Sequence, residues 1–224
     1  MMILALEFSS AQRSVAVVCG RAGEPASSIS EVVETGANGT MAFAMIQSVL
    51  QEAKLERDQI ETLVIGLGPG SYTGIRVALA IAQGWQLAAG PGRIKLLGVS
   101  SADCLAAQAQ AETIRGRVSA VIDAQRDEFY LATYEMSVNG WTEIEPLRIL
   151  TRTEVAARAG TNEMWIGPEV TRWFPDGRTV FPRAATLGQL ALNRNVLVAG
   201  EKLEPIYLRE TNFVKAPPSR WPAL

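Results

Sequence analysis

The first hundred residues alternate short apolar runs with stretches of helical periodicity, and this alternation predicts their elements. Apolar runs bounded by turn residues, typical of buried strands, occur at residues 2–6, 14–19, 28–34, 62–66 and 95–100. Apolar residues recur at helical spacing over residues 40–55, 75–89 and 101–112, and Thr40 is the expected cap of the first helix. Three strands joined by short turns predict an antiparallel meander, whereas strands flanking a crossover helix favour parallel pairing. This order predicts a ribonuclease-H-like α/β domain.

A second unit begins near residue 117 and again opens with strands. We expect strands at residues 118–123, 128–136, 141–150 and 165–166, and short helices at residues 151–159 and 186–195. Asn139-Gly140 is a strong hairpin signal, and Thr151 with Glu154 has the spacing of a capping box. We therefore expect two domains, residues 1–103 and a smaller α/β domain over residues 104–224 whose last segment is free to pack back on the first. Residues 217–224 are expected to be a frayed tail.

A glycine-rich loop, GLGPGSYTGIR at residues 66–76, joins a predicted strand to a predicted helix. Glycines allow a close backbone approach, and a helix N-terminus offers free N–H groups, a combination that can hold a phosphate. The loop lacks the lysine of a Walker loop, because Ile75 and Arg76 follow Gly74. The third glycine of a dinucleotide fingerprint would fall on Ser71 or Thr73. These differences favour a tight structural turn over a phosphate site.

The helix after this loop carries no charged residue between Val77 and Gly92. A helix that is apolar on nearly all sides must be covered on nearly all sides, either by its own sheet or by a partner subunit. The helix at residues 40–55 also has a broad, methionine-rich apolar face, which suits a binding surface. The candidate partner-binding residues are Met41, Phe43, Met45, Val49, Ile75, Ala78, Ala82 and Trp85. Under this hypothesis, Met45→Asp or Ala82→Arg abolishes association while the domain stays folded.

Composition limits the chemistry further. The 224 residues include 21 basic and 23 acidic side chains with no basic run, so direct RNA contact is expected to be weak or shared with a partner. The absence of histidine removes histidine-based zinc sites, Ser-His-Asp triads and histidine acid–base catalysis. Cys19 and Cys104 have no metal or redox spacing. We expect a cytoplasmic chain without a signal peptide or membrane span, and with no catalytic residue, metal or cofactor of its own.

Five segments, in the same order, resemble the bacterial TsaB family, also known as YeaZ. The opening at residues 3–10, ILALEFSS, is similar to the family's ILALDTS, and residues 68–76, GPGSYTGIR, match its GPGSFTGLR. Residues 97–101, LGVSS, match its GVSSL segment, and residues 122–130, IDAQRDEFY, are similar to its DARRGEVY. Residues 205–209, PIYLR, are like the family's PxYLR ending.

The resemblance implies a fold and a role. The implied fold is two ribonuclease-H-like domains of the actin, sugar-kinase and heat-shock-chaperone superfamily. The implied role is that of a non-catalytic activator of a TsaD-like paralogue, which holds the metal and transfers a threonylcarbamoyl group to the adenosine beside the anticodon of tRNA. A TsaE-like ATPase joins the assembly, and tRNA is met only through the complex. Family members also pair with themselves, through the same first-domain helices that otherwise meet TsaD.

The resemblance also suggests an alternative function, a nucleotide-binding kinase or ATPase of the same superfamily. Its vestigial nucleotide site would consist of Glu7, Ser9, Ser10, Gly68 and Gly70. Superfamily kinases use an aspartate where this chain has Glu7, and the bulky Phe8 that follows makes nucleotide binding less favourable. A hydrolase is disfavoured, because no nucleophile and base can be paired without histidine. Asp123 and Arg126 form either a second polar site or a local ion pair at the end of a strand.

Overall fold

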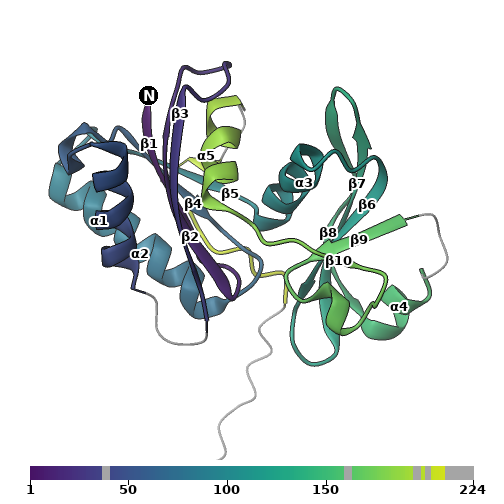
Figure 1. The fold of residues 1–224 in the computed structure, drawn as a ribbon. Helices are drawn as coiled ribbons and strands as arrows, with labels where there is room; N and C mark the ends of the chain where they lie inside the picture. The colour runs from purple at the N-terminus through teal and green to yellow at the C-terminus, as the bar shows by residue number, and fades with distance from the viewer. Residues whose placement is uncertain (37–40, 159–162, 194–197, 200–202, 210–224) are drawn as a thin grey trace, which may run out of the picture.

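The computed structural model describes residues 1–36, 41–158, 163–193, 198–199 and 203–209 of the 224-residue chain. Two β-sheets, each with its own helices, form two halves that lie side by side (Figure 1). The first sheet has six strands in the order β11-β5-β4-β1-β2-β3, and the second has five in the order β10-β9-β6-β7-β8. The predicted α/β class with two sheets is confirmed.

The first sheet combines a meander with parallel strands. Its strands are β1 (Met2–Glu7), β2 (Gln12–Cys19), β3 (Ser28–Thr35), β4 (Thr62–Gly66), β5 (Lys95–Val99) and β11 (Val198–Ala199). Strands β1, β2 and β3 pair antiparallel, whereas β1, β4 and β5 pair parallel, as the sequence predicts. Helix α2 (Tyr72–Ala89) connects β4 to β5, which is the crossover that parallel strands require.

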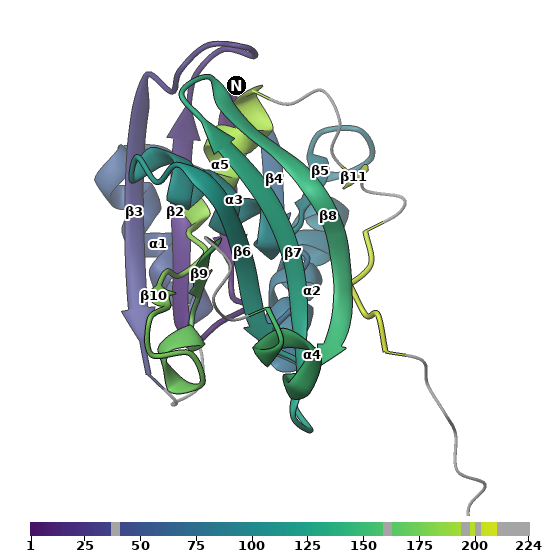
Figure 2. The same ribbon diagram turned by 90° about the vertical axis from the view of Figure 1, so that its right-hand side faces the viewer.

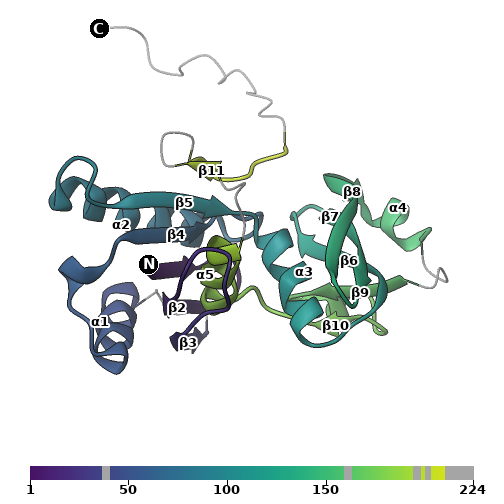
Figure 3. The same ribbon diagram turned by 90° about the horizontal axis from the view of Figure 1, so that it is seen from above.

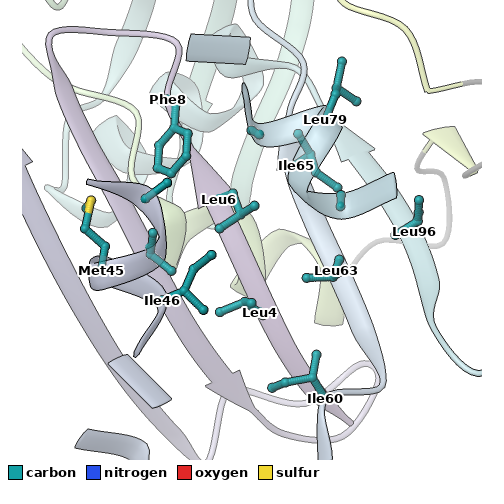
Figure 4. Packing of buried hydrophobic residues seen from close by; sticks show 14 of the residues in the cluster. Leu4, Leu6, Phe8, Met45, Ile46, Ile60, Leu63, Ile65, Leu79 and Leu96 are labelled. Carbon is teal, nitrogen blue, oxygen red and sulfur yellow. The ribbon is translucent and has the colours of Figure 1, made fainter. Parts of the chain in front are cut away.

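Helices cover both faces of this sheet. Helices α1 (Ala42–Ala53) and α2 lie on one face and α5 (Ala184–Asn193) lies on the other (Figure 1). Alternate residues of a strand point to opposite faces. In β1, Leu4 and Leu6 therefore pack with Ile46 of α1 (Figure 4), while Ile3 and Ala5 join the core beneath α5. The short helix η1 (Arg57–Gln59) leads from α1 toward β4.

The second half is built on three long antiparallel strands (Figure 2). Its elements are α3 (Ser101–Ala111), β6 (Gly116–Asp123), β7 (Glu128–Ser137), β8 (Gly140–Thr151), α4 (Arg152–Ala156), β9 (Glu163–Gly167), η2 (Val170–Arg172) and β10 (Arg178–Thr179). Strand β9 pairs parallel with β6, and β10 pairs parallel with β9. Helices α3 and α5 lie next to each other between the two sheets (Figure 3).

Within the described residues, the chain passes from the first half to the second between β5 and α3 and returns between β10 and α5. Strand β11 belongs to the first sheet and helix α5 packs on it, although both follow the second half in sequence. The predicted boundary after residue 103 falls within α3, and the division into domains at that point stays a prediction.

Several element ends differ from those predicted. Helix α2 begins at Tyr72 rather than at residue 75, because the Ser71 hydroxyl accepts a hydrogen bond from the Gly74 N–H and caps the helix earlier. Helix α5 begins at Ala184 rather than at residue 186. Four predictions lie wholly or partly outside the described residues: the Thr40 cap, the last residue of the 151–159 helix, the last two residues of the 186–195 helix and the tail at residues 217–224.

Candidate functional site

An apolar groove runs between α1 and α2 on the outer face of the first half. Its volume is about 840 Å³. Its apolar wall includes Ala42, Phe43, Ile46, Val77, Ala80, Ile81, Gly84, Trp85, Ala88 and Ala89. Charged side chains from Arg57, Asp58, Glu61 and Arg93 also line it, from the segments before and after the two helices. The groove therefore combines an apolar surface with charges of both signs.

Helix α2 is apolar on two faces, one buried against the sheet and one exposed along the groove. Ile75, Ala78 and Ala82 are fully buried against the sheet. Ala80, Gly84 and Ala88, spaced four residues apart, form a stripe of small residues exposed along the groove. A Cβ atom added to Gly84 would meet nothing within 4 Å. A second helix can therefore approach this stripe closely.

The structure divides the eight predicted partner-binding residues. Phe43 is 73% exposed and Met41 is 64% exposed, while Trp85 is partly buried and lines the groove. The other five, Met45, Val49, Ile75, Ala78 and Ala82, are buried in the chain's own core. We correct the candidate surface accordingly, because side chains packed on their own sheet are not available to a partner.

The list of predicted partner-binding residues leaves out exposed residues of α2. Leu87 is 85% exposed, and the stripe of Ala80, Gly84 and Ala88 faces solvent. The four-residue repeat of small side chains was the available signal. It did not decide which face meets the sheet, since both faces of this helix are apolar.

The glycine loop packs tightly on the turn after β1. A Cβ atom at Gly70, which has a φ of +145°, would collide with the carbonyl oxygen of Ser9. The Ser71 N–H donates to that same oxygen at 2.6 Å. Close backbone approach therefore explains the glycine, and this geometry favours the structural interpretation of the loop.

Glu7 fills the space behind this loop. Its Oε1 accepts from the Ser9 N–H at 2.7 Å, and its Oε2 accepts from the Ser101 hydroxyl at 3.0 Å. A side chain on Gly66 would run into the same carboxylate. Burial raises the pKa of Glu7, although the hydrogen bonds from Ser9 and Ser101 act to lower it. The Glu7 carboxyl group is thus held by the chain's own donors, between the glycine loop and the start of α3.

The five predicted nucleotide-site residues are only partly brought together. Ser9, Ser10 and Gly70 line a cleft of about 520 Å³ between the halves. Glu7 and Gly68 do not line it; the Gly68 carbonyl accepts from the Ser101 N–H at 2.7 Å. The Ser10 hydroxyl donates to the Gln12 carbonyl at 2.8 Å, within its own hairpin. The cleft is also lined by side chains of both charges, the basic Arg13 and Arg172 and the acidic Asp123 and Glu169.

Asp123 does not form the predicted strand-end ion pair. Its carboxylate accepts from the backbone N–H and the side-chain amide of Gln125, at 2.7 and 2.9 Å. No ion pair joins it to Arg126 among the residues that the structure describes. Burial, followed by the negative charge of Asp123, raises the pKa of Glu169 across the cleft, while Arg172 lowers it.

The described part of the chain contains no group of three or more His, Cys, Asp or Glu residues placed to hold a metal ion. None of its helices combines the length and the apolar character needed to cross a membrane.

The two halves, each a sheet with its own helices, define the class: the two-domain α/β fold of the actin, sugar-kinase and heat-shock-chaperone superfamily. A sequence model of the TsaD family, described as tRNA N6-adenosine threonylcarbamoyltransferase, matches residues 41–211. The tRNA threonylcarbamoyladenosine biosynthesis protein TsaB of Escherichia coli is 30% identical over 193 residues, which cover 79% of this chain and 82% of that protein. The TsaB protein of Haemophilus influenzae is 28% identical over 194 residues, covering 77% and 80%.

Solved structures agree with this assignment. The structure of YeaZ from Pseudomonas aeruginosa superposes with a TM-score of 0.75 at 26% identity, covering 92% of this chain and 99% of that one. The chain belongs to the TsaB (YeaZ) family, as its sequence motifs predict.

Proposed function

We propose that this chain is a non-catalytic subunit that binds and activates a TsaD-like enzyme in the transfer of a threonylcarbamoyl group to tRNA. The observation that carries the proposal is the exposed groove of α1 and α2, with its stripe of Ala80, Gly84 and Ala88. The names of the relatives, which are biosynthesis proteins for tRNA threonylcarbamoyladenosine, supply the pathway.

The shape and chemistry of the groove favour a helical partner. Helices pack by inserting the ridges of one into the grooves of the other, and small residues permit a close approach. Phe43 stands at the edge of the groove as an exposed aromatic anchor, a residue type enriched at interfaces. Monomeric proteins rarely leave a contiguous apolar face of this kind uncovered.

The same face offers a contact between two copies of the isolated chain. We propose that the isolated protein is a homodimer through α1 and α2 and that the TsaD-like partner replaces the second copy. A TsaE-like ATPase would join the heterodimer, tRNA would be engaged only through the complex, and the chain would need no cofactor of its own.

The position of Glu7 argues against the kinase or ATPase alternative. The Glu7 carboxyl group is buried, is held by Ser9 and Ser101, and does not line the cleft that Ser9, Ser10 and Gly70 face. It is therefore poorly placed to approach a nucleotide or its metal in that cleft. The superfamily's early aspartate is replaced here by a residue whose side chain is occupied within the chain itself.

Gly84→Arg tests the proposed interface. An arginine there projects into the groove without entering the core, and replacing a mid-helix glycine removes a helix penalty of about 1 kcal/mol. We expect the variant to fold at least as stably as the parent but to lose co-purification with the TsaD-like paralogue. In light scattering, the isolated variant should be a monomer.

Gln83→Arg is the matched control, since Gln83 is exposed on the same helix and does not line the groove. It should bind the partner as the parent does. If Gly84→Arg bound the partner with parental affinity, the interface assignment would be wrong.

A further inference from the structure

The segment Leu203–Arg209 links the two halves on the surface. Leu203 is buried in the core of the first half, and the Ile206 N–H donates to the Leu67 carbonyl at 2.9 Å. At the other end, the Arg209 guanidinium donates to the carbonyls of Ala124 and Gln125 at 2.8 and 3.2 Å, in the turn between β6 and β7. The segment runs from β11 toward the second half (Figure 3). It is therefore fixed on both sides of Tyr207.

Tyr207 meets two residues of the start of α2. Its ring centre lies 5.6 Å from that of Tyr72, with an angle of 31° between the ring planes. The guanidinium carbon of Arg76 lies 3.7 Å from the centre of the Tyr72 ring and 6.0 Å from that of Tyr207. These three residues are called the tyrosine platform below.

The distances fix the arrangement of the tyrosine platform. A separation of 3.7 Å is direct contact, so the guanidinium lies above the Tyr72 ring. If Tyr207 were stacked on the opposite face of Tyr72, it would lie much farther from Arg76 than from Tyr72. The Tyr207 ring centre is instead nearly as close to Arg76, at 6.0 Å, as to the Tyr72 ring centre, at 5.6 Å. The Tyr207 ring therefore lies beside the Tyr72 ring. The two ring planes are tilted by 31°, so the neighbouring rings form a shallowly angled aromatic surface.

This surface is open to solvent. Tyr72 is 54% exposed and Tyr207 is 43% exposed. Leu203, Ile206 and Arg209 already hold the segment in place, so the ring faces are not needed to anchor it. Tyr72 also lines the cleft between the halves, where the hydroxyl-bearing Ser9, Ser10 and Ser71 face it.

We propose that the tyrosine platform stacks an unpaired nucleobase of the tRNA held by the complex. The proposal rests on the proposed function, which brings tRNA to this chain. Unpaired RNA bases are recognised by stacking on tyrosine rings and arginine planes, and cation–π contact strengthens such sites. A net charge of −2 without a basic run leaves little phosphate attraction, so stacking is the contact that this chain can contribute.

The platform and the partner groove are formed by different residues. None of Tyr72, Arg76 and Tyr207 lines the groove, although Arg76 directly precedes Val77, the first residue of α2 that does. An RNA ligand at the platform is therefore compatible with a protein partner in the groove. A contact with a protein partner at the platform is the competing occupant, and the experiment below separates the two.

The test uses the complex of the full chain with its TsaD-like paralogue and two RNA probes. One is an unmodified anticodon stem–loop, which presents unpaired bases, and the other is a fully paired RNA duplex. We expect Tyr207→Leu, which keeps an apolar side chain but removes the ring, to weaken stem–loop binding roughly tenfold, as for the loss of about one stacked base. Tyr207→Phe should restore the affinity. Binding of the duplex should not change.

Salt dependence and two further variants complete the test. Loss of stacking should lower the affinity equally at every salt concentration, because no phosphate contact is removed. Leu208→Ala, at an exposed neighbour of Tyr207 in the same segment, should bind as the parent does. Tyr72→Leu, at an exposed position, should repeat the effect of Tyr207→Leu and guards against a folding defect in either variant.

Three results would overturn the proposal. Parental stem–loop affinity in both leucine variants would show that the rings do not contact RNA. Equal weakening by leucine and phenylalanine at position 207 would show that stacking is not the interaction. Loss of the TsaD-like partner in the leucine variants would make the platform a protein contact. Failure of the proposed function would appear differently, as retention of the partner by Gly84→Arg.

Discussion

Glu7 lies fully buried where β1, the glycine loop and α3 meet. Its two oxygens are each held by a donor, Ser9 on one side and Ser101 on the other. Burying a carboxylate is unfavourable unless such donors compensate it, and a neutral carboxyl group avoids the penalty altogether. The result is the raised pKa of Glu7, for which burial is the main cause.

This shift predicts how Glu7→Gln changes stability with pH. A carboxyl group with a raised folded-state pKa favours folding when protonated, so its contribution is complete below the unfolded value near 4.5 and is lost as pH rises through the folded value. An amide cannot titrate, and it can accept from Ser9 while donating to the Ser101 hydroxyl. The variant's free energy of unfolding should therefore increase relative to the parent's as pH rises above about 4.5. The total increase should be about 1.4 kcal/mol for each unit by which folding raises the pKa of Glu7. Urea denaturation at several pH values measures this, and parallel curves for the two proteins would contradict it.

Single residues show where prediction from sequence stops. The missing lysine and the glycine spacing of the loop are visible in the sequence and favour a tight turn, and the close packing of Gly70 on Ser9 agrees with that interpretation. The contact of Glu7 with Ser101 was not visible, since the two residues are 94 positions apart and no pattern links them. The ring pair of Tyr72 and Tyr207 joins residues still farther apart in the chain, and only the fold brings them together.

At the level of elements, periodicity placed most of the longer helices and strands within a few residues. The capping box of Thr151 and Glu154 is present, with the Glu154 carboxylate accepting from the Thr151 N–H at 2.7 Å. Strands β10 and β11 escaped prediction because two residues have no period. The orientation of α2 also escaped, because a helix without charge does not mark its solvent side.

The two faces of α2 predict opposite outcomes for one substitution. Ala82→Arg places a charge in the core against the sheet, where an unpaired buried charge destabilises by about 3–5 kcal/mol. Ala80→Arg places the same side chain in the open groove, where surface changes stay within about 0.5 kcal/mol. Thermal unfolding should separate them clearly. Equal melting temperatures would show that the helix is rotated from its position in the structure.

Burial also decides which substitutions can test association with a partner. Ala82→Arg and Met45→Asp, both expected from sequence to abolish association in a folded domain, act on buried positions. They would remove the partner by disrupting the fold of the first half. Only substitutions at exposed positions such as Ala80 and Gly84 test association itself.

At the scale of the molecule, a carboxylate of the first sheet anchors each crossing between the halves. Glu7 accepts from Ser101 at the start of α3, and Glu31 of β3 accepts from the Arg183 guanidinium and from the Ala185 N–H at the start of α5. Cys104 joins the two crossings, because its thiol contacts the backbone N–H and carbonyl of Arg183 at 3.3 and 3.4 Å. These buried and partly buried polar contacts help to fix the mutual position of the halves.

Cys104 therefore offers a probe of how tightly the halves are held. It is fully buried, and burial, then the nearby charge of Glu7, raises the pKa of its thiol well above the ordinary value, so it should react slowly with a thiol reagent. Glu31→Ala removes the carboxylate that holds Arg183 and Ala185, and we expect it to speed labelling of Cys104 about tenfold for each 1.4 kcal/mol by which opening becomes easier. Cys19, in β2 and partly exposed, serves as an internal control whose rate should not change. Glu34→Ala, on the same strand but away from the crossing, should leave Cys104 protected. If Cys104 reacted equally fast in both alanine variants, loosening of β3 rather than release of the crossing would be the cause, and the anchoring role of Glu31 would be wrong.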